Sequence, residues 1–472
     1  MNKLTQVFVL KEKRFYTVFF IFLVSLLAFL LYRIRGEAFF WDEAWSYLRT
    51  IDYLANRPVT INPTTLDPEI SRAHPLLFYL VQSFFYKTVS STPFAMHLFT
   101  ISIHLSLMLL LVYQLKQFFS NQIALLFTIC FLLQEVILVQ FPMVLPEVSI
   151  ALLSMLAIVY YLRRKMAFVC LCLLALVFIK ESSVVVLITL GLFLLNDLRK
   201  GYIKWYQLYV VIIPSFFFIL HFLLLKFKFG WFIYPVHASL FQPNALSSLL
   251  QNIPTILKFT CWSQGRWALT GVTLFILLKY PSIFSKHKSF LSIAFVFFVT
   301  YVLFTAGNFM MLRYQIPLIL ICTLCFAVMA GKLSGLSTFL VSFGVLFVLL
   351  FHNFFIKSDW IDDIHFNSKQ MMLVHQKTVN YLVEHIDSNV PIETHFLMQT
   401  NLQHSYAGYI KQKSFTQVSP YSLQTSAEVV VISPLEYNAD YHQQIKKSSA
   451  YQLVKRFELN PAWCEIYMKR QR

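Results

Sequence analysis

The chain has 472 residues, of which 58% are hydrophobic and only 13% are charged, against a usual charged share of about 25%. A soluble core of this size could not bury so much apolar surface, so a bilayer must be the solvent for most of the chain, which excludes a soluble globular protein. The net charge of +17 does not indicate nucleic-acid binding, because the sequence has no nucleic-acid motif and basic membrane loops plus a basic C-terminal domain account for it.

The first apolar run covers about residues 15–31 and follows Lys11, Lys13 and Arg14. This order is similar to that of a signal peptide, but no small-residue cleavage site follows, so we expect an uncleaved first membrane helix. Ten more apolar segments bring the expected number of spans to about eleven. They lie at about residues 94–114, 122–140, 144–162, 166–180, 182–196, 205–225, 266–280, 289–306, 314–330 and 334–356.

The basic residues predict the orientation of these spans. With a cytoplasmic N-terminus, alternate loops place Lys116, residues 163–165 and Lys332 on the cytoplasmic side, as the positive-inside rule requires. The first long loop, about residues 34–93, and the domain after residue 356 then lie on the extracytoplasmic side. We expect an integral membrane protein, in a bacterial inner (plasma) membrane.

The first loop contains two adjacent carboxylates, Asp42 and Glu43, which are bracketed by aromatic residues. At a membrane–water boundary such a pair can orient a hydroxyl nucleophile or accept its proton. The alternative is two solvated acids at the start of an ordinary loop. Later in the loop His74 precedes Pro75, where we expect an amphipathic helix that lies in the interface.

Three further charged positions fall on the same side of the membrane. Glu147 begins the fourth helix, where it either faces a cavity or complements the helix dipole. Lys180 and Glu181 end the fifth span, either as a phosphate-binding site or as a snorkelling pair. Arg313 beside Tyr314 begins the tenth span, where the guanidinium either forks onto phosphate oxygens or anchors the helix.

After about residue 357 the composition becomes polar, which predicts a small α/β domain over residues 357–472, following a membrane domain over residues 1–356. We expect a helix at about 367–387 and strands at 395–398, 428–432, 451–457 and 463–468. The 7 Cys lie mostly in apolar spans without metal-ligand spacing, so neither a disulfide framework nor a zinc site is expected.

Taken in order, these motifs resemble those of the C-type (GT-C) integral-membrane glycosyltransferases. The resemblance is closest to the group that includes the protein O-mannosyltransferases and the lipid A aminoarabinose transferase, and it covers most of the membrane part. Two positions depart from the pattern: residues 140–143 lack the Arg that relatives often carry before the acid, and His97 replaces another Arg. The matching motifs are the early acid pair, His74-Pro75-Leu76-Leu77-Phe78-Tyr79-Leu80, Pro146-Glu147, Ile179-Lys180-Glu181 and Arg313-Tyr314-Gln315-Ile316-Pro317.

The resemblance implies an α-helical polytopic fold with a small C-terminal extracytoplasmic domain. It also implies transfer of a sugar from a polyprenyl-phosphate donor to a lipid, glycan or protein acceptor on the non-cytoplasmic face, usually with inversion. The implied site comprises the catalytic acids Asp42 (general base), Glu43 and Glu147, the donor-phosphate ligands Lys180, Arg313, Arg72 and His74, and the substrate-binding Tyr47, Tyr314 and His237.

We expect no cofactor, since the sequence carries no dedicated metal signature. A divalent cation stays an open alternative that would need more oxygen ligands than Asp42, Glu43 and Glu147 provide.

Two other functions compete with the glycosyltransferase. A transporter or flippase of a lipid-linked substrate would need charges or broken helices deep in the membrane, whereas here the polar residues gather at one face. A polysaccharide polymerase or ligase would not be expected to place an acid pair directly after the first helix.

Overall fold

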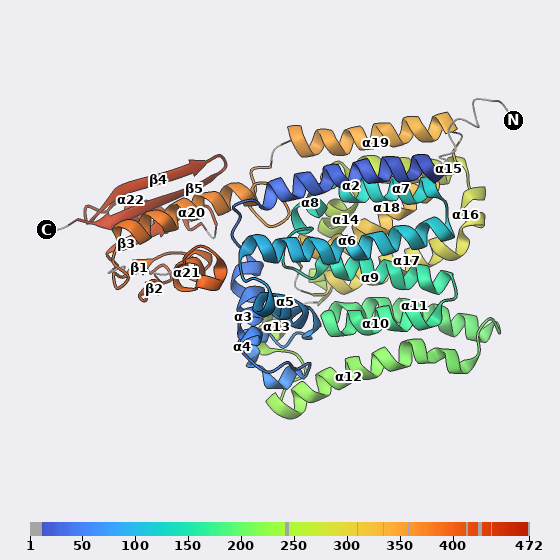
Figure 1. Cartoon of the computed structure of the whole chain (residues 1–472), viewed down its shortest axis with the longest axis horizontal. Helices are drawn as coiled ribbons and strands as arrows, with labels where there is room; N and C mark the ends of the chain where they lie inside the picture. The colour runs from blue at the N-terminus through green and yellow to red at the C-terminus, as the bar shows by residue number, and fades with distance from the viewer. Residues whose placement is uncertain are drawn as a thin grey trace.

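The structure is a computed structural model that describes residues 12–240, 245–308, 310–333, 335–356, 358–411, 414–422, 427–435 and 437–470. Lys11 and the first residue of the predicted segment 334–356 lie outside these ranges. About 70% of the chain is helical. Figure 1 shows the long helices side by side, with a smaller domain that contains a sheet at one end of them.

Within the described residues, seven helical segments are long and apolar enough to cross a membrane. They contain α2 (Glu12–Ile34), α6 (Pro93–Phe118), α11 (Val184–Arg199), α12 (Tyr209–Phe229), α17 (Lys288–Ala306), α18 (Ile316–Ala330) and α19 (Gly335–Phe355). Shorter helices pack among them: α7 (Asn121–Leu132), α8 (Glu135–Gln140), α9 (Glu147–Leu162), α10 (Met166–Ile179), α14 (Ala245–Cys261), α15 (Arg266–Lys279) and α16 (Ser282–Lys286).

Each of the eleven predicted spans contains a helix, but among the described residues only seven hold one that is long and apolar enough to cross a membrane. The helices in the segments 122–140, 144–162, 166–180 and 266–280 are shorter. The segment 122–140 is interrupted, since α7 ends at Leu132 and α8 begins at Glu135. The sequence did not predict α14, which contains Pro254 and mixes polar with apolar residues.

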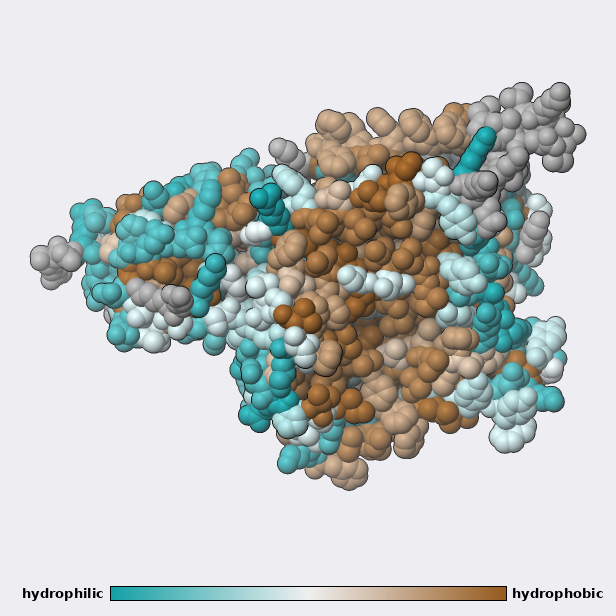
Figure 2. Space-filling view, in the orientation of Figure 1, coloured by the Kyte–Doolittle hydropathy of each residue, from teal (hydrophilic) through white to brown (hydrophobic). Residues whose placement is uncertain are grey.

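A broad hydrophobic band covers the long helices, and hydrophilic residues border it at both ends (Figure 2). Large apolar side chains on the outer faces of α12 and α19, such as Phe216 and Phe343, are more than half exposed. Exposing such a contiguous apolar surface to water costs free energy, whereas contact of the same surface with lipid chains does not. The chain is therefore an integral membrane protein.

The first loop folds into short helices at the end of the bundle that also carries the C-terminal domain (Figure 1). Its last helix, α5, begins two residues after the predicted start at Pro75. The elements at this end are η1 (Glu43–Tyr47), α3 (Leu48–Ala55), η2 (Pro63–Thr65), α4 (Pro68–Ser71), α5 (Leu77–Thr88) and α13 (Pro235–Leu240).

The C-terminal domain pairs α20 (Ser368–His385), which confirms the predicted helix, with a five-stranded sheet of order β2-β1-β3-β5-β4. Strand β1 is parallel to β2 and β3, and β5 is antiparallel to β3 and β4. The strands are β1 (Ile392–Glu393), β2 (Val418–Ser419), β3 (Val429–Ile432), β4 (Tyr451–Leu459) and β5 (Ala462–Lys469); α21 (Phe396–Gln403) and α22 (Ala439–Lys447) complete the domain.

The strand predicted at residues 395–398 is wrong, because this stretch begins α21. His395 lies before the helix and its Nδ1 accepts a hydrogen bond from the Met398 amide (3.5 Å), so it caps the first turn. The buried residues of α21 follow a helical spacing, and the strand lies earlier, at β1.

The C-terminal domain is fixed against the first loop. The Phe39 amide donates to the Ala407 carbonyl oxygen (3.3 Å), and Arg33 Nη2 donates to Ser368 Oγ (3.2 Å). Gly408 has φ +83, and a Cβ there would come within 2.6 Å of Pro93 Cγ. Only glycine adopts this backbone freely at such a close approach.

Candidate functional site

A cavity of about 510 Å³ opens where the first loop, the helix ends and the C-terminal domain meet. Its wall is charged or aromatic in one part and apolar in another. The residues that line it include Trp41, Asp42, Trp45, Tyr47, Arg72, Ala73, His74, Glu147, Lys180, Glu181, Phe218, Phe222, Leu225, His237, Phe304, Tyr314 and Phe396.

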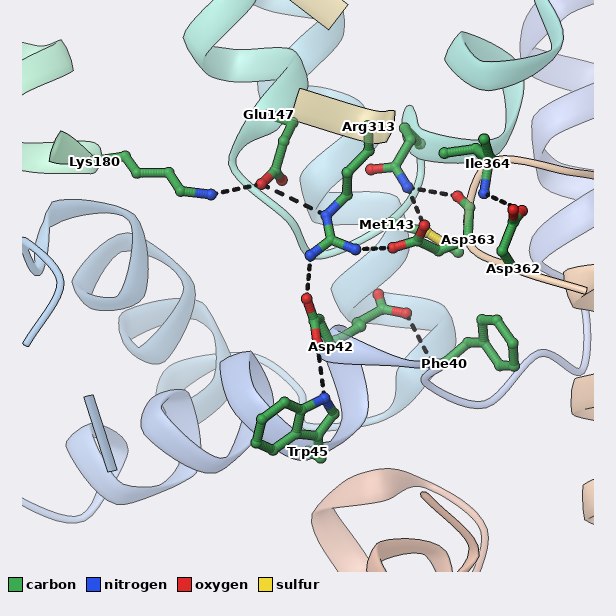
Figure 3. Close-up of polar contacts among 12 residues, drawn as sticks. Phe40, Asp42, Trp45, Met143, Glu147, Lys180, Arg313, Asp362, Asp363 and Ile364 are labelled. Atoms are coloured by element: carbon green, nitrogen blue, oxygen red, sulfur yellow. Dashed lines mark hydrogen bonds and ion pairs between the residues drawn. The ribbon is translucent and has the colours of Figure 1, made fainter. Parts of the chain in front are cut away.

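The ionic centre of the site is Arg313, which lies in the turn η5 (Leu312–Gln315) before α18 and is only 1% exposed. Its guanidinium binds the carboxylates of Asp42 and Asp363 (Figure 3). Its Nε lies 3.7 Å from Glu147 Oε1, an atom that also accepts a hydrogen bond from Lys180 Nζ (2.8 Å). A buried guanidinium without such partners would be very costly, so these carboxylates determine where Arg313 can lie.

Asp42 is an ionised carboxylate that lines the cavity. Burial alone would raise its pKa, but the charge and hydrogen bond of Arg313 outweigh burial and hold the pKa below its ordinary value. Its Oδ1 accepts a hydrogen bond from Trp45 Nε1 (2.8 Å) and its Oδ2 faces Arg313. Each oxygen has two lone pairs, so the ionised group can still accept a proton or hydrogen bond from the cavity.

Asp363 is a site residue that sequence reasoning missed. It lies between the last long helix and the C-terminal domain, and Gln140 Nε2 donates to its carbonyl oxygen (2.5 Å). Burial raises the pKa of Asp363 to about 6, against the opposing effect of Arg313 and with a further rise from Asp42. The available signal was a second acid pair, Asp362-Asp363, on the same predicted side as the first.

Glu43 is adjacent to Asp42 in sequence but does not line the cavity. It is 1% exposed, and its Oε1 accepts hydrogen bonds from the Val144 amide (2.7 Å) and pairs with His97 Nε2 (2.8 Å). Its Oε2 accepts from the Phe40 amide (3.1 Å). These contacts join the first loop to the start of the α9 region, which gives Glu43 a positioning role.

The predicted phosphate ligands divide into two groups. Lys180, Arg72 and His74 line the cavity, whereas Arg313 is buried behind the carboxylates. Arg72 lies over the Trp45 ring, 3.8 Å from its centroid. His74 Nδ1 lies 3.0 Å from both carboxylate oxygens of Glu181.

The predicted substrate-binding residues Tyr47, Tyr314 and His237 all line the cavity. Lys180 Nζ lies 4.1 Å from the Tyr314 ring centroid, and the rings of His74 and His237 are 5.1 Å apart. Burial lowers the pKa of His237 to about 4, with a further contribution from His74, so the His237 ring is neutral at neutral pH.

The apolar wall comes from membrane helices. Phe218, Phe222 and Leu225 of α12 line the cavity together with Phe304 of α17. This wall places apolar side chains of two membrane helices beside the charged residues, and an amphiphile with an anionic head would match both parts.

The backbone at the cavity is strained. Three of the five described non-glycine residues with positive φ line it: Trp41 (φ 52), Arg72 (φ 51) and Ala73 (φ 58). Such conformations cost of order 1–3 kcal/mol each and persist where the surrounding structure imposes them, often at functional sites.

Among the residues that the structure describes, no three His, Cys, Asp or Glu side chains come together in an arrangement that could hold a metal ion. The Asp42, Asp363 and Glu147 carboxylates instead converge on the Arg313 guanidinium.

Comparison with known proteins identifies the fold. No protein-family model and no curated protein matches the chain. The crystal structure of ArnT from Cupriavidus metallidurans bound to undecaprenyl phosphate matches 95% of this chain and 98% of its own, with a TM-score of 0.59 and 11% identity. Its apo state matches 96% of this chain and 98% of its own, with a TM-score of 0.57 and 10% identity.

ArnT is the lipid A aminoarabinose transferase and has the GT-C fold. The structure thus confirms the fold that the motif resemblance implied: the chain is an α-helical polytopic membrane protein of GT-C fold with a small C-terminal domain that contains a sheet.

The contacts of Glu43 predict that it stabilises the fold. Replacing Glu43 with Ala leaves buried His97 and two backbone amides without their acceptor, and we expect a loss of about 3 kcal/mol. The midpoint of thermal unfolding in detergent measures this loss of stability. The control Glu69→Ala, an exposed acid in the same loop, should leave the midpoint unchanged; equal midpoints for both variants would refute the structural role of Glu43.

Proposed function

We propose that this protein is a membrane glycosyltransferase that moves a sugar from a polyprenyl-phosphate donor to an acceptor hydroxyl on the extracytoplasmic face. One observation carries the proposal: the cavity joins an ionised carboxylate, cationic side chains and an apolar wall that leads into the membrane region. These are the groups that a base, a phosphate and a prenyl chain require. A solved structure of the same fold, that of ArnT, binds undecaprenyl phosphate.

The donor phosphate would lie among Lys180, Arg72 and His74, which reach the cavity from two segments, the first loop and the end of α10. Lysine binds phosphate as a point charge, and arginine can bind two oxygens at once. The prenyl chain would follow the apolar wall formed by α12 and α17, where lipid-soluble carbon gains most from burial.

Asp42 is the proposed general base. It takes the proton of the acceptor hydroxyl while that oxygen bonds to the anomeric carbon, and the bond from this carbon to the phosphate oxygen breaks. The electron pair leaves with the prenyl phosphate, whose growing charge the cations stabilise. Attack opposite the leaving phosphate inverts the anomeric centre. Since phosphate is already a good leaving group, no general acid is needed.

Arg313 acts through Asp42 as a positioning residue. It is buried and its guanidinium is occupied by Asp42 and Asp363, so it does not reach the donor phosphate. Because two acids share one guanidinium, Asp363 limits how strongly Arg313 depresses the basicity of Asp42.

A single-turnover assay in nanodiscs tests the function. The donor is the polyprenyl-phosphate-sugar pool of the native membrane, offered together with a glycan and lipid extract of the same cells as the acceptor, and the mass of released prenyl phosphate is measured. We expect release by wild type and at least a roughly hundredfold slower release by Asp42→Asn, since general-base catalysis contributes about 10²–10⁴-fold. The control Asp359→Asn changes an exposed aspartate at the same end of the protein and should match wild type.

Equal release by Asp42→Asn and wild type would remove Asp42 as the base. No release by either protein, with donor still bound, would favour a transporter of the lipid-linked substrate.

The shared guanidinium predicts a pH effect. Asp363, with its pKa raised to about 6, takes up a proton as the pH falls through that value and stops competing for Arg313. Arg313 then pairs more strongly with Asp42, whose basicity drops, so wild-type kcat should fall below about pH 6. Asp363→Asn should lack this step and show a reduced kcat at pH 7, because the neutral Asn leaves Arg313 to pair with Asp42 alone and so weakens the base.

The matched control is Asp362→Asn, since the Asp362 side chain accepts a hydrogen bond from the Ile364 amide (3.1 Å) rather than from Arg313. It should keep the step, moved to somewhat lower pH because the Asp362 charge helps to raise the pKa of Asp363. Persistence of the step in Asp363→Asn would contradict the assigned coupling.

A further inference from the structure

We propose that Trp41, Trp45 and Phe396 form an acceptor subsite that binds a pyranose ring, so that the acceptor is a carbohydrate rather than a peptide. This inference rests on the proposed function and names the class of the second substrate. Phe396 belongs to α21 of the C-terminal domain, so that domain supplies part of the substrate site.

The three rings form an aromatic corner beside the base. The Phe396 ring centroid lies 6.1 Å from that of Trp41 and 5.5 Å from that of Trp45, with interplanar angles of 80° and 83°. All three side chains line the cavity. A pyranose ring presents flat C–H surfaces and peripheral hydroxyls, so the C–H surfaces can pack on aromatic faces while the hydroxyls keep polar partners.

Those polar partners adjoin the corner. Trp45 Nε1 donates to Asp42, and the Arg72 guanidinium lies over the Trp45 ring. A sugar packed in the corner would therefore have the proposed base as an acceptor for one hydroxyl and Arg72 as a donor to another. An aliphatic alcohol would pack on the rings and offer its one hydroxyl to Asp42, but it would have no second hydroxyl for Arg72.

The corner is separate from the wall assigned to the prenyl chain. That wall comes from α12 and α17, whereas the corner comes from the start of the first loop and from α21. The charged residues lie in the same cavity, so donor and acceptor can meet at Asp42 without competing for one surface.

The geometry of the corner is fixed before any substrate binds. Trp41 is held at φ 52, a conformation that is a genuine outlier for a bulky residue. The contacts of Ala407 and Gly408 with Phe39 and Pro93 hold the C-terminal domain against the loop that carries Trp41. Preorganised aromatic walls reduce the entropic cost of binding a weak ligand.

The surroundings do not favour an extended peptide. Peptides commonly bind by adding a strand to an exposed sheet edge, which supplies backbone hydrogen bonds. The edge strands of the sheet, β2 and β4, contribute no residue to the cavity. Turns and helices form the corner instead, and the Trp41 carbonyl oxygen already accepts hydrogen bonds from the Ala44 amide (3.0 Å) and the Trp45 amide (3.3 Å).

Acceptor probes test the subsite in nanodiscs free of sugar-headed detergents. Methyl hexopyranosides and an N-acetylated serine hexapeptide amide are offered separately, and the mass of the glycosylated probe is measured with the native donor pool. We expect transfer to a hexopyranoside. Phe396→Ala should raise the KM of the hexopyranoside at least tenfold while the KM of the donor stays within twofold. Phe396→Tyr keeps an aromatic ring and should keep the hexopyranoside KM near that of wild type.

Phe457→Ala is the matched control, because Phe457 lies in β4 of the same domain, away from the cavity, and should leave both KM values unchanged. Saturation-transfer NMR with the hexopyranosides and no donor provides a readout independent of catalysis, and Phe396→Ala should abolish the signal. Transfer to the peptide or to water alone, or an unchanged hexopyranoside KM in Phe396→Ala, would overturn the subsite. Absence of prenyl phosphate release with every probe would instead refute the glycosyltransferase, and the NMR result would still decide the subsite.

Discussion

Everything at the candidate site depends on the burial of one guanidinium. Arg313 is removed from water, and a cation in that position is tolerated only when carboxylates surround it. Asp42 comes from the first loop, Glu147 from the start of α9 and Asp363 from the segment before the C-terminal domain. These segments are far apart in sequence. Each contributes a carboxylate that lies against the Arg313 guanidinium, and these ion pairs hold the three segments together.

This arrangement connects the chemistry to the domain architecture. The C-terminal domain is more than a cap on the bundle, because the segment that leads into it supplies Asp363 and its helix α21 supplies Phe396. Glu43 and His97 hold the first loop from the other side. The loop that carries the proposed base Asp42 is thus held on one side by the C-terminal domain and on the other by the pair of Glu43 with His97. The cationic side chains and the apolar wall line the cavity.

Features that depend on local composition, such as the membrane helices, could be predicted from the sequence. Features that depend on contacts between residues far apart in the chain could not. Apolar runs identified the membrane helices, and Asp42, Glu147 and Lys180 were found because charge at a membrane boundary is unusual. Asp363 and Phe396 could not be assigned, since their roles arise from contacts across the chain, as the 271-residue separation of Asp42 and Arg313 illustrates. Asp42 and Glu43 looked alike as neighbours, but consecutive residues of a helical turn point in different directions, so one lines the cavity and the other does not.

We propose that this cavity holds a polyprenyl-phosphate donor with its phosphate next to Asp42. Electron cryomicroscopy of the protein in nanodiscs with undecaprenyl phosphate would locate the lipid. We expect phosphate oxygens within hydrogen-bond distance of Lys180 or Arg72, a prenyl chain along Phe218 and Phe222, and an unbroken Arg313–Asp42 pair. Lipid bound outside the cavity, or phosphate bound to Arg313 in place of Asp42, would contradict it.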